Sequence, residues 1–444
     1  MPRYRILLWT AIALSILGYL FFGYKLERTQ TFQLISVYSL IFTAYLYLVY
    51  NKNSISISTI IVLGLVFRLL FLFCTPTLSD DFYRFIWDGR LWFNGINPFA
   101  ELPTCYIKNI ELAPPGINLH LYNLLNSPTH YTVYPPIPQF INWLAAWLAT
   151  DSIWLSAIIM RIPLIIAEIG TLILLPKVLV GFNLNSKNTI WYALNPLIII
   201  ELTGNLHHEA LMLFFIVLFL ANYQQGKIYG AAFALAMSVA AKLLPLMFIP
   251  YLLLKMKYKE SLKFLLVFGV SLAIVFFPLL DASFFRGIEN SLLLYYQKFE
   301  FNAGIYYVFR QLGYWVKGYN MIALIGKIFA LTVTISIFYI SIKSAIKKWK
   351  LPETLLWIST LFAFFSLILH PWYISLIILF GSMTNYRFGI LWSFLIMGTY
   401  AGYSATGFKE VMWVVGIEFI AVLAMLIIEI INQTKLKATL KVAP

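Results

Sequence analysis

The sequence is poor in charged residues and in cysteine. Asp, Glu, Lys and Arg make up only 11% of its 444 residues, whereas a soluble domain carries about a quarter. So few charges cannot cover a water-facing surface, which predicts an all-α polytopic membrane protein. The two cysteines, Cys74 and Cys105, show no CxxC or metal-ligand spacing. They could form one disulfide or remain free thiols.

The sequence also lacks the marks of a nucleotide-binding or multidomain protein. It contains no GxGxxG or other nucleotide cradle, no visible internal repeat and no linker rich in Ser or Gly. We therefore expect one membrane-embedded domain over residues 1–444.

Positive charge and aromatic rings are abundant. Lys and Arg number 32 against 18 Asp and Glu, and Phe, Trp and Tyr form 18% of the chain. A net charge of +14 can indicate nucleic-acid binding. Here the basic residues cluster in short loops between apolar runs, which is typical of the cytoplasmic loops of membrane proteins. We expect the lipid bilayer, not nucleic acid, as the partner of this charge.

Apolar runs predict about 11 to 14 membrane crossings, some of them broken or paired half-helices. The first run has no small-residue cleavage site after it, so we interpret it as a retained span and not a signal peptide. The predicted spans are residues 4–23, 32–50, 56–74, 152–175, 188–203, 206–222, 228–241, 243–254, 261–280, 321–343, 353–370, 373–384, 388–406 and 410–431.

The lysine-rich segments predict the orientation. They are residues 255–263, residues 343–350 and the tail from Lys435. If these and the N-terminus are cytoplasmic, both termini lie inside. The two long loops, 75–150 and 281–320, then fall outside, and so do the polar clusters described below. This pattern predicts a multi-pass protein of the plasma (inner) membrane with its active site on the outer face.

The stretch "SDDFYRFIWDGRLWF" carries two adjacent aspartates, Asp80 and Asp81. Read as a helix from Ser79, it has an apolar stripe, Phe82, Phe85, Ile86, Gly89 and Phe93, opposite the polar residues Asp81, Arg84 and Asp88. This pattern predicts a helix in the membrane interface with its apolar side in lipid. The aspartates could merely favour the positive end of the helix, with Ser79 as its cap. A carboxylate at this place could also act as a general base for a sugar hydroxyl or as a metal ligand.

The segment 131–148 follows in the same loop. Its prolines, Pro135, Pro136 and Pro138, should prevent a regular helix before about residue 138. The remainder is amphipathic and predicts a second interfacial helix, although a stiff connector is equally compatible.

A polar cluster interrupts the later apolar runs. Glu201, Asn205, His207, His208 and Glu209 stand between two of them. Ionisable groups at this depth face a cavity or a partner, because exposure to lipid costs about 2.5–3.5 kcal/mol or more. We favour a substrate pocket over a hydrogen-bond network or a zinc site, since adjacent histidines cannot both point inward from one helix face.

Lys242 is a lone cation inside another apolar run. It could bind the phosphate of a lipid-linked substrate, or pair with Glu209 or Glu201. His370 and Trp372, in "HPWY", could line a substrate pocket or anchor the chain at the interface. Arg286, Lys298 and Arg310 lie among aromatic residues in loop 281–320, where they could bind phosphate or form a surface belt.

These pieces, in this order, resemble the GT-C membrane glycosyltransferases that use polyprenyl-phosphate sugars, and most closely the bacterial polyprenol-phosphate-mannose-dependent mannosyltransferases. The likeness covers about residues 80–373, through "SDDFYRFIWDGRLWFNGINPF", "VYPPIPQFINWL", "NPLIIIELTGNLHHEALM", the Lys242–Pro245 segment and "HPWY". Asp80 or Asp81 matches the acidic position of the family, whose pattern does not decide between them. His207 and Glu209 match a His-x-acid pair in which Asp is the commoner second residue. The N-terminal region departs from the family, with spans beyond the usual single one before the acidic motif.

The resemblance implies a GT-C-like bundle with interfacial helices in the first outer loop. It implies a hexosyltransferase that moves a sugar, expected to be mannose, from a polyprenyl-phosphate carrier to a glycan or glycolipid acceptor. Asp80 or Asp81 would be the base, and Lys242, with Arg310 or Arg286, would hold the leaving phosphate. We expect no metal and no cofactor. The residues expected to bind substrate are Arg84, Asp88, Asn205, His207, Glu209, Lys242, Arg310, His370 and Trp372.

Two other functions compete with this interpretation. A transporter or flippase would need ionisable residues along a path across the bilayer. Its candidates are Arg68, Arg161, Lys242 and Lys327. A non-catalytic assembly factor would tolerate loss of both aspartates.

Overall fold

The apolar runs form helices in a computed structural model, which describes residues 2–149, 151–297 and 299–442. The labels α, η and β mark α-helices, 3-10 or π helices, and strands. In the first half of the chain the helices are α1 (Pro2–Tyr24), α2 (Thr31–Tyr50), η1 (Lys52–Ser54), α3 (Ile57–Leu69), α4 (Asp81–Phe93), α5 (Pro103–Lys108), η2 (Ile110–Leu112), α6 (Leu119–Asn123), α7 (Pro136–Ala149), α8 (Ile153–Gly181), η3 (Ser186–Thr189), α9 (Ile190–Ala193), η4 (Ile198–Gly204) and α10 (Glu209–Gln224).

The second half is also helical apart from one short hairpin. Its elements are α11 (Ile228–Ala241), η5 (Leu244–Phe248), α12 (Ile249–Lys255), α13 (Tyr258–Phe276), η6 (Phe277–Leu279), α14 (Ala282–Gln297), α15 (Gly304–Lys317), α16 (Ile322–Ile346), α17 (Leu351–Phe364), η7 (Pro371–Ile374), α18 (Ser375–Ser382), α19 (Phe388–Leu395), η8 (Ile396–Gly402), β1 (Tyr403–Ser404), β2 (Gly407–Phe408) and α20 (Met412–Val442). The strands pair antiparallel.

Within the described residues, six helices are long and apolar enough to cross a membrane: α1, α2, α8, α13, α16 and α20. A seventh span would consist of η4 and α10, which meet at a bend of 113°. Six further apolar helices, built on α3, α11, α12, α17, α18 and α19, have only 10–17 residues. The all-α polytopic architecture is therefore confirmed, whereas the total of 11 to 14 crossings stays a prediction.

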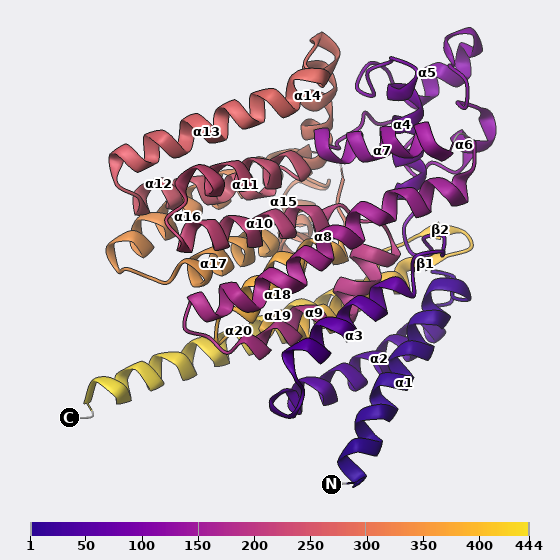
Figure 1. Ribbon diagram of the computed structural model, residues 1–444. Helices are drawn as coiled ribbons and strands as arrows, with labels where there is room; N and C mark the ends of the chain where they lie inside the picture. Colours follow the sequence, from indigo (N-terminus) through magenta and orange to yellow (C-terminus); the bar gives the residue numbers. More distant parts are fainter. Residues whose placement is uncertain (1, 150, 298, 443–444) are drawn as a thin grey trace.

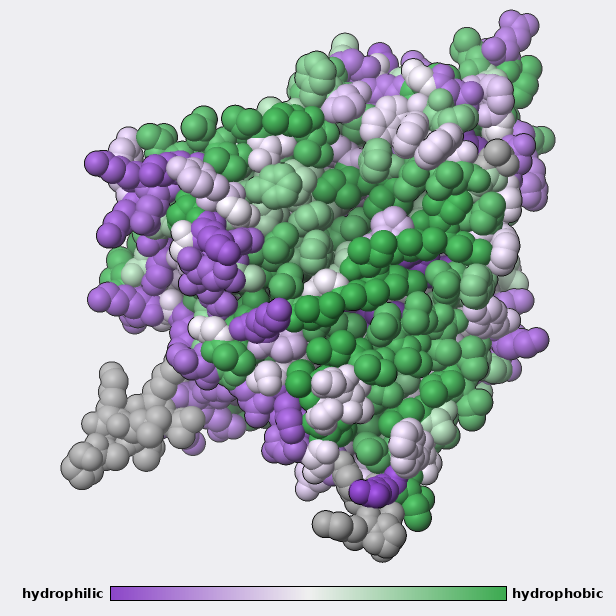
Figure 2. Space-filling view, viewed as in Figure 1, coloured by the Kyte–Doolittle hydropathy of each residue, from purple (hydrophilic) through white to green (hydrophobic). Residues whose placement is uncertain are grey.

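The ends of the helices separate two polar regions. The chain termini and the connections α12–α13 and α16–α17 lie at the left and bottom of Figure 1, and α4 to α7 with the hairpin lie at the right and top. Figure 2 shows hydrophilic residues at the left and at the upper right, with a broad hydrophobic band between them. The lysine-rich segments and the first long loop thus occupy opposite ends of the molecule.

The acidic motif forms a buried helix, which corrects the expectation of an apolar face lying in lipid. α4 begins at Asp81, with Asp80 at the N-cap position, and not at Ser79. Its apolar stripe lies inside the protein because α7 and α8 pack against α4. Three residues of that stripe are buried, Phe82, Phe85 and Ile86.

α4 and α7 approach each other most closely at Gly89. A Cβ atom there would overlap the backbone carbonyl of Asn142 in α7. Only glycine permits such a close approach of two backbones. Gly89 therefore fixes the distance between the acidic helix and α7.

Gly89→Ala is expected to destabilise the protein by about 1–3 kcal/mol, because the added methyl group must push α4 away from α7. The measurement is the midpoint of thermal unfolding of the purified protein in detergent. Gly269→Ala is the matched control, since a Cβ at Gly269 in α13 meets nothing within 4 Å. Equal unfolding midpoints for the two variants would contradict this account.

The prolines at 135, 136 and 138 do not prevent α7 from starting. α7 starts at Pro136 and contains Pro138 in its first turn, so the expected start near residue 138 is wrong. The first backbone N–H groups of a helix have no partner within the helix, and proline there removes no hydrogen bond. Three rings of α7, Phe140, Trp143 and Trp147, stack in a row along one side.

The expected span 188–203 is broken into η3, α9 and the π-helix η4. The fully buried Arg161 of α8 satisfies the carbonyls at the end of η4, because Nε donates to Thr203 O at 2.8 Å and Nη2 to Gly204 O at 3.0 Å. Its Nη1 donates to Cys74 O at 2.7 Å. Such substitute partners allow a helix to end inside a membrane protein. Cys74 and Cys105 are both free thiols.

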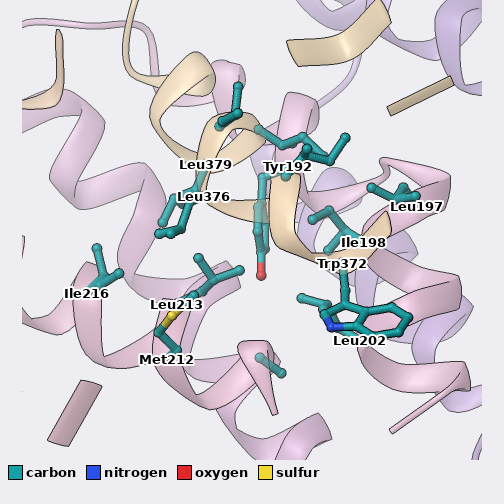
Figure 3. Close-up of a cluster of buried hydrophobic side chains, with 14 of the residues drawn as sticks. Tyr192, Leu197, Ile198, Leu202, Met212, Leu213, Ile216, Trp372, Leu376 and Leu379 are labelled. Carbon is teal, nitrogen blue, oxygen red and sulfur yellow. The ribbon is translucent and has the colours of Figure 1, made fainter. Parts of the chain in front are cut away.

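The core beside this break is hydrophobic. Figure 3 shows side chains of α9, η4, α10 and α18 meeting in one cluster, with Trp372 at its edge beside Leu202. The labelled members of the cluster are Tyr192, Leu197, Ile198, Leu202, Met212, Leu213, Ile216, Trp372, Leu376 and Leu379, and all are buried. Trp372 joins this core to the cavity described below.

The predicted loop 281–320 is mostly helical, since it forms α14 and α15. The segment between these helices pairs with the chain before "HPWY". Phe301 N donates to Leu367 O at 3.0 Å, and Leu369 N donates to Phe301 O at 2.8 Å. Lys298 lies outside the described residues. The loop 281–320 is thus attached to the segment that carries His370 and Trp372.

Candidate active site

A cavity of about 790 Å³ lies where four parts of the chain meet. They are α4, the bend between η4 and α10, the "HPWY" segment and α16. Its wall contains most of the residues predicted from the sequence: Asp80, Asp81, Arg84, His207, Glu209, Lys242, His370 and Trp372. The other three predicted residues, Asp88, Asn205 and Arg310, do not line it. In the described part of the chain, no group of three His, Cys, Asp or Glu side chains is arranged to hold a metal ion.

The two adjacent aspartates have different surroundings. Asp80 forms an ion pair with Arg28, from the connection between α1 and α2. Arg28 also lies over the ring of Tyr403 at 4.7 Å. Asp81 accepts a hydrogen bond from the Asn126 amide at 2.7 Å, and within the described ranges it pairs with no Lys or Arg. Asp81 is therefore the carboxylate that remains free to accept a proton.

Arg84 and Asp88 form a buried pair that shapes one wall. Arg84 Nε donates to Asp88 Oδ1 at 2.7 Å, and Arg84 Nη1 donates to His130 O at 2.8 Å. Asp88 lies behind the cavity, where it also accepts hydrogen bonds from Thr132 and Gln139. Asp88 thus fixes Arg84, and Arg84 fixes the 127–132 segment that lines the cavity.

Glu201 and Asn205 hold His207 from behind. His207 Nδ1 lies 2.9 Å from Glu201 O and 3.4 Å from Glu201 Oε2. The Glu201 carboxylate accepts hydrogen bonds from Tyr400 at 2.8 Å and from Asn205 at 3.3 Å. Leu206, just before His207, has a φ of +63°, a conformation that non-glycine residues seldom adopt and that is frequent at functional sites. The backbone here is bent and not helical, so His207 and His208 can both line the cavity, an arrangement that one helix face would not allow.

Lys242 forms the pair with Glu209 that the sequence left open, and its binding of a phosphate stays a prediction. Its ammonium group pairs with Glu209, lies 4.2 Å from the centre of the Tyr373 ring and lines the cavity. An ammonium group has three donors, so it can keep Glu209 and bind a further anion.

A stack of rings continues from His207 along the wall. His207 stacks on Trp372 at 3.5 Å between ring centres, and Trp372 stacks on His370 at 4.5 Å. Burial, with smaller contributions from the nearby Lys242 and His207, lowers the pKa of His370 to about 3. His370 is therefore neutral at physiological pH, so it serves as a flat wall and not as a cation for phosphate.

The far part of the cavity is apolar. On α16 its lining follows one helix face, with Ala330, Val333, Thr334 and Ile337 spaced by three, four and seven residues. Opposite lie Phe362 and Phe365 at the end of α17, and Leu243, Leu244 and Met247 beside Lys242. This part of the cavity lies against the middle of α16, a helix long enough to span a membrane.

Arg310 and Arg286, the other cations predicted to hold the phosphate, do not line the cavity. Arg310 pairs with Glu300 and lies 4.5 Å from the centre of the Tyr307 ring, and Arg286 donates to Ala100 O at 2.9 Å. The arginines proposed for a transport path do not line the cavity. Arg68 is buried against Glu168, Gly64 O and Ala193 O, and Arg161 is bonded to carbonyls. Neither is free to carry a substrate charge across the bilayer.

Sequence reasoning missed several residues of the wall, among them Arg28, Asn126, Tyr400 and Tyr403. Each lies in a connection or at a helix end, far in the chain from the residues it contacts. No local pattern marks them. A basic residue directly after the first span was the one available signal, for Arg28.

The sequence of residues 15–257 matches the family model described as alpha-(1->6)-mannopyranosyltransferase, N-terminal domain, over more than half of the chain. An alpha-(1->6)-mannopyranosyltransferase A from Corynebacterium glutamicum is 26% identical over 157 residues, which cover 34% of this chain and 30% of that relative. The match thus spans less than a third of the relative's length. The family segment includes Asp80, Asp81, His207 and Lys242, but not His370, Trp372 or α16. The resemblance to membrane mannosyltransferases is confirmed, and the chain belongs to the family described as alpha-(1->6)-mannopyranosyltransferase, N-terminal domain.

Proposed function

We propose that this protein is a membrane hexosyltransferase that moves mannose from a polyprenyl-phosphate carrier to a glycan or glycolipid acceptor, with Asp81 as the general base. The observation that carries the proposal is the two-part cavity. The first part holds Asp81 together with the remaining polar groups. The second part is an apolar channel at the depth of the hydrocarbon. Lys242 lies between them, at the start of the apolar residues Leu243 and Leu244.

A polyprenyl-phosphate sugar has the same order of parts. Its isoprenoid chain fits the channel against α16, its phosphate reaches Lys242, and its sugar extends toward Asp81. A nucleotide sugar would instead place a ribose and a hydrogen-bonding base in an apolar channel, where unpaired polar groups are costly. The lipid carrier is therefore the donor that the cavity favours.

The transfer is a direct displacement. Asp81 takes the proton of an acceptor hydroxyl, whose oxygen attacks the anomeric carbon of the donor. The bond from that carbon to the phosphate oxygen breaks, and the phosphate keeps the electron pair. The ammonium group of Lys242 stabilises the charge that develops on the phosphate. Asp80 does not take this role, because Arg28 holds it as an ion pair.

We place the active site at the outer face of the plasma membrane. The cavity opens among α4, the 126–135 segment and the hairpin, at the end of the molecule opposite the lysine-rich connections (Figure 1). Cytoplasmic loops of membrane proteins carry the excess of Lys and Arg. This orientation also puts both termini in the cytoplasm.

The test is sugar transfer by the purified protein in lipid vesicles, with radiolabelled mannosyl polyprenyl phosphate as donor and a mannoside glycolipid as acceptor. We expect labelled product from this donor and none from GDP-mannose in the same vesicles. Glucosyl polyprenyl phosphate, offered in place of the mannosyl donor, tests whether the protein transfers glucose as well as mannose. Transfer from GDP-mannose alone would overturn the proposed donor, and no transfer from any of the three would overturn the proposed function.

A further inference from the structure

One nitrogen of the cavity wall lacks a partner. His207 is only 2% exposed, and its Nε2 makes no hydrogen bond within the described part of the chain. Asp81 Oδ2 lies 4.0 Å from this nitrogen. That distance is too long for a direct hydrogen bond. A buried polar atom without a partner costs about 1–3 kcal/mol, so a ligand group that pairs with it would be bound favourably.

The contacts of the other nitrogen determine what Nε2 can bind. A backbone carbonyl can only accept a hydrogen bond, so Nδ1, at 2.9 Å from Glu201 O, must carry a hydrogen. In the neutral ring Nε2 then has the free electron pair and acts as an acceptor. The Trp372 ring, stacked at 3.5 Å, prevents the imidazole from turning away. The free pair therefore stays directed at the space beside Asp81.

Two acceptors, a carboxylate oxygen and an imidazole nitrogen, thus face one space 4.0 Å apart. One hydroxyl group has a single hydrogen and cannot donate to both. Two hydroxyl groups on neighbouring positions can, because one donates to each acceptor.

We propose that His207 Nε2 binds a second sugar hydroxyl, adjacent to the hydroxyl that Asp81 deprotonates, and so selects the substrate. This inference rests on the proposed function. The second hydroxyl has two possible sources with the same chemistry. It is either an acceptor hydroxyl that lies beside the nucleophile, or the donor hydroxyl on the carbon next to the anomeric centre. In both cases Glu201, Tyr400 and Asn205 act as positioning residues that hold the histidine in its acceptor form.

The experiment compares complete and deoxygenated substrates in the vesicle assay. One acceptor lacks the hydroxyl next to the nucleophile, and one donor is the 2-deoxy sugar. A site built to bind a hydroxyl rejects the analogue that lacks it, because the buried acceptor stays unpaired. We expect the wild-type protein to lose about a hundredfold or more in kcat/KM with one of the two analogues, which identifies the source.

Two substitutions separate this role from a structural one. His207→Asn keeps an amide nitrogen at the position of Nδ1, for the bond to Glu201, but has no group at the position of Nε2. His207→Gln reaches that position with its amide. We expect His207→Asn to lose about a hundredfold with the complete substrate and to treat both substrates alike within about threefold. His207→Gln should retain part of the preference. The preference of each variant is expressed relative to that of the wild-type protein, because this comparison cancels the different intrinsic reactivity of the deoxy donor.

Tyr50→Phe is the control for expression and assay. Tyr50 is exposed and is the last residue of α2, at the end of that helix away from Arg28. The proposal is overturned if the wild-type protein accepts both analogues as well as the complete substrates, a comparison that needs no variant to fold. It is also overturned if His207→Asn keeps the wild-type preference. Absence of transfer from every complete donor would instead refute the proposed function.

Discussion

Asp81→Asn is expected to lower the rate of mannosyl transfer by about 10²- to 10⁴-fold, the usual contribution of a general base. The substituted amide has nearly the shape of the carboxylate but cannot accept the proton of the acceptor hydroxyl. The measurement is kcat in the vesicle assay at equal amounts of folded protein. Among the described residues, the Asp81 carboxylate accepts one hydrogen bond, from the Asn126 amide, and lies 4.0 Å from His207 Nε2, so the fold should tolerate the change.

Asp80→Asn is the matched variant, one residue away. It removes the ion pair with Arg28, and pairs of this partly exposed kind contribute only about 0–1 kcal/mol. We expect less than a tenfold loss of activity, caused by small shifts of the Arg28 segment. Equal losses in the two variants, or a larger loss for Asp80→Asn, would refute the choice of Asp81 as the base.

The distinction between these two aspartates could not be predicted from the sequence. It depends on Arg28, 52 residues before Asp80, and on Asn126, 45 residues after Asp81. Sequence patterns report on neighbours along a helix or strand, whereas these contacts cross between separate connections. The motif therefore narrowed the proposed base to two neighbouring residues, and their different contacts in the fold are the reason for proposing Asp81.

The helices were predicted where periodicity and length agreed. The span 228–241 coincides with α11 (Ile228–Ala241), the span 32–50 lies within α2, and the span 321–343 begins one residue before α16 and otherwise lies within it. Prediction failed where a helix is broken, as at η4, because the partner that permits the break is Arg161 from α8. It also failed for the lipid-facing side of α4, since an apolar stripe is the same whether it meets lipid or another helix.

The buried polar residues give the same lesson. Asp88 was expected in the substrate pocket because it lies on the polar side of the helix with Asp81. In the structure Thr132 and Gln139 enclose it, and its partner Arg84 lines the cavity in its place. A polar stripe identifies residues that need partners, but not whether the partner is a substrate or another side chain.

Ala330→Trp is expected to lower transfer from a long-chain polyprenyl donor by roughly 10²-fold, because a bulky ring fills the channel that would hold the isoprenoid and displaces the donor from Asp81. Ala330 lines the apolar part of the cavity on α16. The measurement compares two mannosyl phosphate donors, one with a full polyprenyl chain and one with a single isoprene unit. The short donor does not extend along α16, so its rate should change by less than about threefold.

Leu331→Trp is the control on the same helix. Leu331 is 61% exposed on the outer side of α16, so its replacement adds the same ring toward lipid and should leave both donors unaffected. A loss with Ala330→Trp that is equal for long and short donors would mean that the ring disturbs the polar part of the site and not a lipid channel. No loss with either donor would mean that the isoprenoid lies elsewhere, and that the apolar lining does not select the donor. A loss confined to the long donor ties the channel to the lipid carrier, since only chain length differs between the two substrates.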